Sequence, residues 1–276
     1  MTRRRAAAQT VVSTAKAART TVKQTGARNL QVLIKLALEE DIGSGDITTQ
    51  ATIDPKRQGT AIIHAKTPLV VAGLCVAETV FSTVDKKLAW STNTKDGDRV
   101  QAGTALAHIR GPLASILTAE RTALNFLQRL SGIATLTRTF VDAVAGTNVK
   151  ILDTRKTTPG WRALEKGAVR AGNGTSHRMG LYDRYLIKNN HITAVGSLEK
   201  AMRSCLLDCR ARGLRRADNS HRSGPHAPLI EVEVRTLKEA IIAAKAGVDI
   251  IMLDNMTVAQ VREAVKIVGA VREPPL

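Results

Sequence analysis

The chain has 276 residues, of which 43% are hydrophobic and 3% aromatic, and it carries a formal net charge of +17. This length and apolar content suffice for one large domain, or for a large and a small one, with a buried core. No apolar run approaches the roughly 18 residues of a membrane-spanning helix. Three cysteines in neither a disulfide nor a zinc-ligand pattern exclude a disulfide scaffold and favour a reducing compartment.

The positive charge is concentrated in two segments. Residues 1–38 hold eight Lys or Arg and no acid, and residues 201–228 hold six Arg against two Asp, so together they supply 12 of the 17 charges. Because aromatic side chains are scarce, the stacking platforms of single-strand binders are not expected. We therefore do not expect a nucleic-acid role, although basic tails that contact phosphate without reading sequence are the alternative.

Residues 1–28 form a basic extension rich in Arg, Ala and Thr. This is the composition of an organelle transit peptide, and the alternative is a disordered or helical bacterial extension. We expect a cytoplasmic protein, or a mitochondrial or plastid one if the extension is a transit peptide.

Residues 29–112 have the pattern of a small α/β domain. Apolar residues from Leu30 to Ala37 recur at helical spacing, and Gly43 and Gly45 end that helix. Strand-like runs and turns follow, with Val100, Leu106 and Ile109 expected to face inward. In the stretch "GSGDITT", Asp46 and Thr48 could be catalytic, but turn and cap roles are favoured.

A long helical pattern follows over residues 114–146. Four leucines are expected to be buried, and three polar residues step along the opposite face: Leu117, Leu124, Leu127 and Leu130, against Arg121, Asn125 and Arg129.

The remaining chain alternates apolar runs with helical patterns. The runs are "VKILDTRK", "YLIKNN", "LIEVEV" and "VDIIMLDN", and each precedes an amphipathic stretch. Repeated strand-then-helix units imply parallel strands with crossover helices. We expect a parallel β/α barrel, or part of one, over residues 113–276.

In such barrels the functional residues lie at the carboxyl ends of the strands. The four runs end in polar residues, in chain order Arg155 with Lys156, then Lys188, Glu233 and Asp254. Alternation along "LIEVEV" places Glu231 and Glu233 on one face, where an acid is costly unless a cation or a substrate donor satisfies it. Exposure at the strand end is the alternative.

The segment 154–192 carries eight Lys or Arg and two His against two acids. Arg and Lys bind carboxylates and phosphates, and Arg can hold a carboxylate through two parallel hydrogen bonds. Carboxylates such as Glu233 and Asp254 suit Mg²⁺, which commonly binds through one or two of them together with substrate phosphates. The residues alone therefore predict a multiply anionic substrate and a metal ion, without naming the substrate.

The chain also closely resembles the quinolinate phosphoribosyltransferases, or carboxylating nicotinate-nucleotide pyrophosphorylases. The resemblance runs from about Asn29 to about Val268, and its most specific parts are "DTRKTTPG", "HRMGLYD" and "LIKNNHI", in this order and spacing. It implies a small N-terminal α/β sandwich domain and an incomplete β/α barrel. It also implies a homodimer or higher homo-oligomer, in which each site is completed by the partner subunit.

The reaction that the resemblance implies joins quinolinate to phosphoribosyl pyrophosphate with Mg²⁺ as cofactor. Its products are nicotinate mononucleotide, pyrophosphate and CO₂, in de novo NAD biosynthesis. By matching motif positions, four basic residues hold the quinolinate carboxylates: Arg155, His177, Arg178 and Lys188.

The remaining matched residues have other implied roles. Arg121 resembles the cation contributed across the dimer interface. Lys156 lies near the donor phosphates or the dicarboxylate. Glu233 and Asp254 bind the ribose hydroxyls and Mg²⁺, and with Lys156 they form the catalytic set.

Several features depart from the family pattern. Asn173, Ser176 and Asn189 stand where relatives have Gly, Asn and Asp. An Arg-rich insert, 205–228, replaces a shorter loop, and the chain ends 22 residues after Asp254, which predicts a C-terminally shortened barrel. Two alternative functions follow: a catalytically impaired relative that binds nucleic acid or a partner protein, and a phosphoribosyltransferase of the same fold with another acceptor.

Overall fold

The computed structural model describes residues 29–211 and 228–272, in a mixed α/β fold. The chain divides into two compact units, residues 1–177 and 178–276. The expectations for the extension 1–28, for most of the insert and for the last four residues fall outside the described residues. None of the described helices is long and apolar enough to cross a membrane.

The first unit combines an antiparallel sheet with packed helices. Its strands are β1 (Gln58–His64), β3 (Ala89–Ser91) and β5 (Ala105–Pro112) in the order β1-β5-β3, with a separate pair, β2 (Leu69–Val70) and β4 (Arg99–Val100). Its helices are residues 29–42, α2 (Ile47–Thr52), α3 (Leu74–Val84), α4 (Leu113–Ala143) and α5 (Arg162–Ala171).

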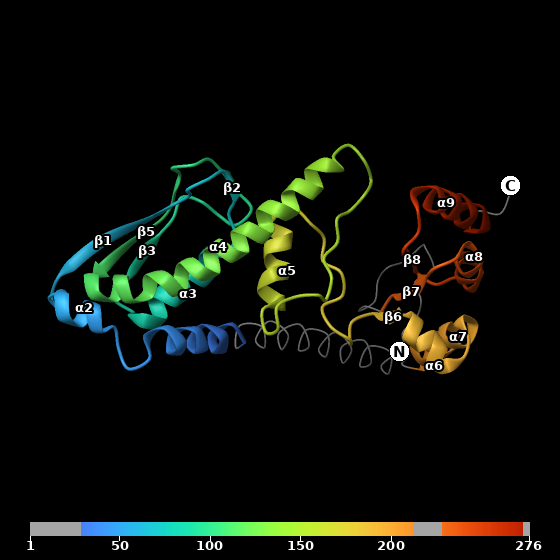
Figure 1. Ribbon diagram of the computed structural model, residues 1–276, viewed down its shortest axis with the longest axis horizontal. Coiled ribbons are helices and arrows are strands. Elements are labelled where there is room, and N and C mark those ends of the chain that lie inside the picture. The colour runs from blue at the N-terminus through green and yellow to red at the C-terminus, as the bar shows by residue number, and fades with distance from the viewer. Residues whose placement is uncertain (1–28, 212–227, 273–276) are drawn as a thin grey trace, which may run out of the picture. The chain divides into compact units, whose positions relative to one another are not determined.

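The core of the first unit lies where α3, the sheet and the long helix α4 meet (Figure 1). In β5 the side chains of Leu106 and Ile109 are buried, and Val100 of β4 is also buried, as the alternation predicted. Asp46 caps α2 by accepting a hydrogen bond from the Thr49 amide at 3.0 Å, which confirms the cap role.

The buried face of α4 differs from the expectation at its first turn. Leu127 and Leu130 are buried as predicted, but Leu117 is 39% exposed, so its prediction as a core residue was wrong. The inward stripe instead starts at Ile116, and because successive helical residues are about 100° apart, Leu117 points away from it. Phe126, which the leucine pattern passed over, is 1% exposed at the centre of the stripe.

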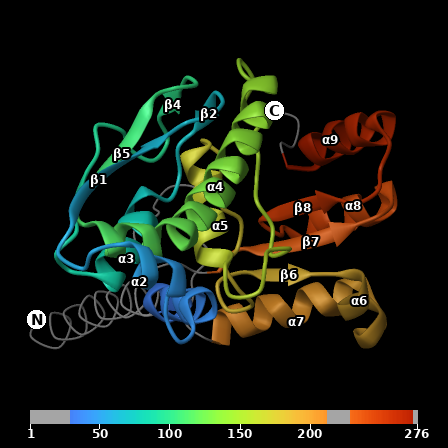
Figure 2. The same ribbon diagram turned by 60° about the vertical axis from the view of Figure 1, so that its left-hand side comes forward.

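The second unit contains a parallel sheet with the strand order β6-β7-β8. The strands are β6 (Tyr185–Ile187), β7 (Ile230–Val234) and β8 (Ile250–Leu253), and Figure 2 shows them side by side. The helices are α6 (Asn189–Val195), α7 (Leu198–Ala211), α8 (Leu237–Ala246) and α9 (Val258–Arg272). The predicted parallel pairing of these three runs is confirmed.

The predicted first strand, residues 149–156, does not form as an extended strand. Its pairing is limited to one parallel bridge between Leu152 and Thr175. The bridge partner Thr175 lies just after the turn 172–174 that follows the end of α5 at Ala171. The Asp153 amide donates to the Thr175 carbonyl at 3.2 Å, and the Thr175 amide donates to the Ile151 carbonyl at 2.8 Å.

Candidate functional site

The first unit presents two of the predicted cations on the segment that follows the Leu152 bridge. Arg155 is half-buried, and among the described residues its Nε atom is buried without a hydrogen-bond partner. Lys156 is exposed, and within the same ranges its ammonium group contacts no acid. Because a buried donor without an acceptor is costly, Arg155 has the character of a group awaiting an anionic ligand.

This segment is anchored to α4 and α5. Arg129 of α4 donates to Thr158 Oγ1 at 2.8 Å and to Glu165 Oε1 at 2.9 Å, while Glu165 Oε2 accepts from the Thr158 amide at 3.3 Å. Burial raises the pKa of the Glu165 carboxyl, but hydrogen bonds from Thr158 and Arg129 outweigh burial and hold this pKa below its ordinary value. The ring of Trp161 stacks on Phe126 at a centroid distance of 4.7 Å and fixes the start of α5.

A buried ion pair connects this segment with His177. Lys166 of α5 is 2% exposed, and its ammonium group contacts Asp153 Oδ1 and lies 3.3 Å from the His177 carbonyl oxygen. Asp153 Oδ1 also accepts from the His177 amide at 2.8 Å. The predicted site residues Arg155 and His177 therefore lie on two segments joined through Asp153 and Lys166.

The turn after α5 contains two of the departures from the family pattern. Asn173 adopts a left-handed backbone with φ 65°, a conformation that Asn tolerates better than most residues. Ser176 accepts a hydrogen bond from Arg170 at 3.1 Å. The turn is closed by backbone hydrogen bonds: the Asn173 amide donates to the Arg170 carbonyl at 2.9 Å, and the Gly174 amide donates to the Val169 carbonyl at 2.9 Å.

In the second unit, predicted residues occupy the carboxyl ends of neighbouring strands. Lys188 follows β6 and begins α6, and its ammonium group lies 2.9 Å from Glu233 Oε2 on β7. The Lys188 side chain is 47% exposed and that of Glu233 is 10% exposed. Asn189, a further departure, is exposed in the first turn of α6. The predicted pairing of a β7 acid with a cation is therefore present.

Two further acids of this sheet are also paired with cations. Glu231, which is 3% exposed, lies 3.0 Å from Arg184, and Asp254 lies 3.4 Å from Arg235. Asp254 follows the end of β8, next to β7, and its amide donates to the Val234 carbonyl at 2.9 Å. Arg178, at the start of the second unit, is 8% exposed.

The metal prediction rests on Glu233 and Asp254 alone. Within residues 29–211 and 228–272, no group of three or more His, Cys, Asp or Glu could hold a metal ion. Two carboxylates at the ends of adjacent strands still fit the donor set of Mg²⁺, which completes its shell with water and substrate phosphates.

Arg121 has a different environment from the other predicted site residues. It lies exposed on α4 and has no hydrogen-bond or ion-pair partner among the described residues. Such a cation is available to a ligand or to another subunit.

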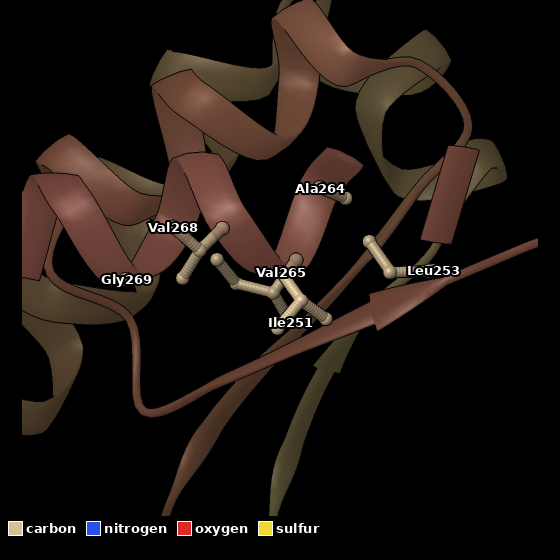
Figure 3. A pocket seen from close by; sticks show the side chains of 6 residues that line it. All are labelled: Ile251, Leu253, Ala264, Val265, Val268 and Gly269. Carbon is tan, nitrogen blue, oxygen red and sulfur yellow. The ribbon is translucent and has the colours of Figure 1, made fainter. Parts of the chain in front are cut away.

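A cavity of about 340 Å³ lies between β8 and α9 (Figure 3). Its lining is aliphatic and contains no charged side chain: Ile251, Leu253, Ala264, Val265, Val268 and Gly269. Its chemistry suits apolar groups, so the cation-bearing segments are the better candidates for an anionic substrate.

Sequence reasoning missed the residues that hold the cations in place. The helical pattern places Arg129 only on a polar face, and the sequence indicates no role for Asp153, Glu165 and Lys166. A buried lysine on an amphipathic helix has no signal in the sequence, because the pattern assigns charged residues to solvent. The stretch "TRKTTPGWRALEK" does place many charged groups within two turns of a helix start.

Comparisons with known proteins agree over most of the chain. The family model described as the quinolinate phosphoribosyl transferase N-terminal domain matches residues 46–131, and that of the C-terminal domain matches residues 133–274. A probable nicotinate-nucleotide pyrophosphorylase [carboxylating] of Bacillus subtilis is 41% identical over 87% of this chain and 78% of its own length. Quinolinate phosphoribosyltransferase [decarboxylating] 1 of Nicotiana glauca is 40% identical over 83% of this chain and 64% of its own.

Solved structures give the same result. NadC from Streptococcus pyogenes matches with a TM-score of 0.77 and 42% identity, over 88% of this chain and 80% of its own. The nicotinate-nucleotide pyrophosphorylase from Francisella tularensis matches with a TM-score of 0.75 and 38% identity, over 87% and 79% respectively.

Proposed function

Because the chain belongs to the quinolinate phosphoribosyltransferase family, we propose that it transfers a phosphoribosyl group from phosphoribosyl pyrophosphate to quinolinate. The products are nicotinate mononucleotide, pyrophosphate and CO₂, and the reaction serves NAD biosynthesis. The observation that carries the proposal is the conjunction of the family's two domains with the segment "TRKTTPG", where the buried Arg155 Nε has no partner among the described residues.

We propose that the predicted basic residues hold the dicarboxylate. Arg155, His177, Arg178 and Lys188 bind the two carboxylates, and Lys156 neutralises the donor phosphates or the dicarboxylate. Quinolinate and the donor are both anionic, so these cations offset the repulsion between the two reactants and orient them. A ligand with two adjacent carboxylates should therefore bind more tightly than a ligand with one carboxylate.

The reaction needs neither a covalent nucleophile nor a general base. The ring nitrogen of quinolinate forms a bond to the anomeric carbon as the bond to pyrophosphate breaks, through a transition state with oxocarbenium character. The carboxylate next to the nitrogen then leaves as CO₂, and the pyridinium nitrogen stabilises the carbanion until a proton from solvent replaces it. Positioning and electrostatics supply the rate.

Glu233 and Asp254 complete the catalytic set with Lys156. We propose that the two carboxylates hold the ribose hydroxyls and Mg²⁺, with their cationic neighbours Lys188 and Arg235 fixing their orientation. When bound, Mg²⁺ supplies charge neutralisation to the leaving pyrophosphate.

The finer architecture belongs to the same proposal. We propose an α/β sandwich domain over residues 29–112 and a partial β/α barrel over residues 113–276, supported by the parallel sheet and the Leu152–Thr175 bridge. We also propose a homodimer or higher homo-oligomer in which Arg121 serves the partner's site. The cytoplasm is the proposed location, with an organelle as the alternative because relatives from Nicotiana tabacum and Arabidopsis thaliana are named mitochondrial and chloroplastic.

Calorimetric titration with quinolinate and with nicotinate tests the substrate assignment directly. We expect saturable quinolinate binding and at least tenfold weaker nicotinate binding, because about 1.4 kcal/mol from the second carboxylate corresponds to a factor of ten. Arg155→Met should abolish the preference, whereas the exposed Lys66→Met should retain it. Equal affinity for the two ligands would refute the dicarboxylate assignment and favour another acceptor.

A further inference from the structure

Lys166 contacts two segments that carry proposed substrate-binding residues, Arg155 on one and His177 on the other. Asp153 lies two residues before Arg155, and His177 ends the segment that pairs with residues 151–153. Lys166 contacts both through the Asp153 carboxylate and the His177 carbonyl. No substrate role is assigned to Lys166, since a side chain that is 2% exposed is enclosed by protein.

We propose that Lys166 and Asp153 form a positioning pair that sets the spacing between Arg155 and His177, and with it the fit of quinolinate. The proposal rests on the function proposed above. Its atoms form a closed arrangement: the ammonium group contacts Asp153 Oδ1, that oxygen accepts from the His177 amide at 2.8 Å, and the ammonium group reaches the His177 carbonyl at 3.3 Å.

The hydrogen bonds to the Asp153 carboxylate use only its Oδ1 oxygen. Asp153 Oδ2 is buried and has no hydrogen-bond partner among the described residues, so both donors converge on Oδ1. Without the ammonium group, a buried carboxylate would retain a single backbone donor. Such a carboxylate draws in water or a proton, and either change shifts the His177 segment relative to Arg155.

The secondary structure makes this single contact important. Parallel pairing between the two segments is limited to the Leu152–Thr175 bridge, so a full strand ladder does not fix their spacing. Turn 172–174 sits between α5, which carries Lys166, and the His177 segment. The ion pair therefore ties the start of the Arg155 segment, the end of the His177 segment and the intervening helix together.

The test compares quinolinate affinity in the full chain for three variants: Lys166→Met, Asp153→Asn and the double variant. Lys66→Met, at an exposed position of the same unit, is the control. We expect each single variant to weaken quinolinate binding by about ten- to a hundredfold, the effect of losing a hydrogen bond to a charged ligand group. The control should bind as the wild type does.

The double variant separates positioning from stability. It removes both buried charges, so thermal stability should recover toward the wild-type value, because a neutral pair lacks the uncompensated charge of either single variant. If the pair positions the site, quinolinate affinity stays low in the folded double variant. Recovery of affinity together with stability would overturn the proposal, as would unchanged affinity in a folded Lys166→Met protein.

Hydrogen exchange supplies a readout that needs no ligand. The amides of Thr175 and His177 donate to the Ile151 carbonyl and to Asp153 Oδ1. In the folded double variant both should exchange faster than in the wild type, while core amides of α4 keep their protection. Unchanged exchange would overturn the positioning role. If the wild-type chain binds no quinolinate, the substrate assignment fails, and the exchange result still decides the role of the pair.

Discussion

Lys188 and Glu233 face each other from the carboxyl ends of β6 and β7 at 2.9 Å. The lysine side chain is 47% exposed, so the pair contributes at most about 1 kcal/mol to folding. Its larger effect is expected in ligand binding, where a hydrogen bond to a charged group is worth about 1.5–3 kcal/mol.

Lys188→Met should therefore weaken quinolinate binding by about ten- to a hundredfold, and it should also lower the melting temperature, because Glu233 is 10% exposed and loses its cation. Titration calorimetry and thermal denaturation measure the two quantities. Lys200→Met, at an exposed position of α7, is the matched control and should leave both unchanged. Equal affinities for the Lys188→Met protein and the wild type would remove Lys188 from the site.

Glu165 provides a prediction about pH. Its pKa in the folded protein is lowered by hydrogen bonds from Thr158 and Arg129, against an ordinary value of 4.5. A lowered pKa stabilises the folded state above the ordinary value, and this stability is lost as pH falls through the lower folded-state pKa. Glu165→Gln should therefore be destabilising near neutral pH, and its deficit should shrink on acidification below pH 4.5.

Urea unfolding of the wild type and Glu165→Gln at several pH values measures this difference in the free energy of unfolding. Glu199→Gln, exposed on α7, is the control and should show no comparable pH-dependent deficit. A constant deficit across the acidic range would contradict the assignment of the stabilisation to the ionised carboxylate.

The environment of a residue could be predicted where its charge and its position in a strand pattern pointed to the same conclusion. The alternation in "LIEVEV" predicted that Glu231 and Glu233 need a cation or a substrate donor, and in the structure each lies beside a cation. The cations that pair with these acids could not be predicted, because each ion pair joins residues far apart in the sequence. The burial of Lys166 could not be predicted either, because it lies on a helix with an amphipathic pattern. The assigned roles of all the predicted site residues remain predictions: Arg121, Arg155, Lys156, His177, Arg178, Lys188, Glu233 and Asp254.

At the scale of elements, the turn after α5 depends on two neighbouring backbone positions. Gly172 ends α5 close to α4, and a Cβ atom there would lie 2.8 Å from the Thr137 Cβ. Asn173 has φ 65°, in the left-handed region where a residue other than Gly or Asn is strained by about 1 kcal/mol.

Gly172→Ala should lower the free energy of unfolding by about 1–3 kcal/mol, the typical cost of overpacking. At the next position, Asn173→Ala should cost about 1 kcal/mol and Asn173→Gly less, because only the alanine is strained. Urea unfolding ranks the three variants. A stable Gly172→Ala protein, or an Asn173→Gly protein less stable than Asn173→Ala, would contradict the described turn.

Elements whose apolar residues recur at a clear helical or strand spacing were predicted from the sequence, whereas the first predicted strand was not correct. The helices after Gly111 and the strands at "YLIKNN", "LIEVEV" and "VDIIMLDN" formed, whereas "VKILDTRK" formed only a bridge. An apolar run needs a partner of matching length to become a strand, and its own sequence does not reveal whether that partner exists. In the same way, α7 reaches Ala211, so the first residues of the expected insert are helical.

At the scale of the whole molecule, the oligomer proposal depends on Arg121. This residue is exposed and lacks a partner among the described residues, as expected of a cation that completes a neighbouring subunit's site. Arg121→Met and Lys188→Met proteins should each be nearly inactive.

Mixing the two inactive proteins should restore part of the activity, because a mixed dimer has one site free of both substitutions. Turnover after unfolding and joint refolding measures the recovery, and refolding each variant alone is the control. Absence of recovery in a mixture that forms mixed dimers would contradict the assignment of Arg121 to the partner's site.

The family was recognisable because its motifs are local and ordered along the chain, while the global arrangement depends on contacts that no motif encodes. The charged residues and their positions predicted a multiply anionic substrate and a metal ion, without naming the substrate. The identification of quinolinate came from "DTRKTTPG", "HRMGLYD" and "LIKNNHI", and the comparisons bear out that family.

Release of CO₂ from carboxyl-labelled quinolinate by the purified 276-residue chain tests the central claim most directly. With Mg²⁺ present, we predict release that depends strictly on phosphoribosyl pyrophosphate, matches the nicotinate mononucleotide formed, and is lost in Arg155→Met. Nicotinate in place of quinolinate should yield no nucleotide. Quinolinate binding without donor-dependent release of CO₂ would contradict the proposed reaction and leave a dicarboxylate-binding protein.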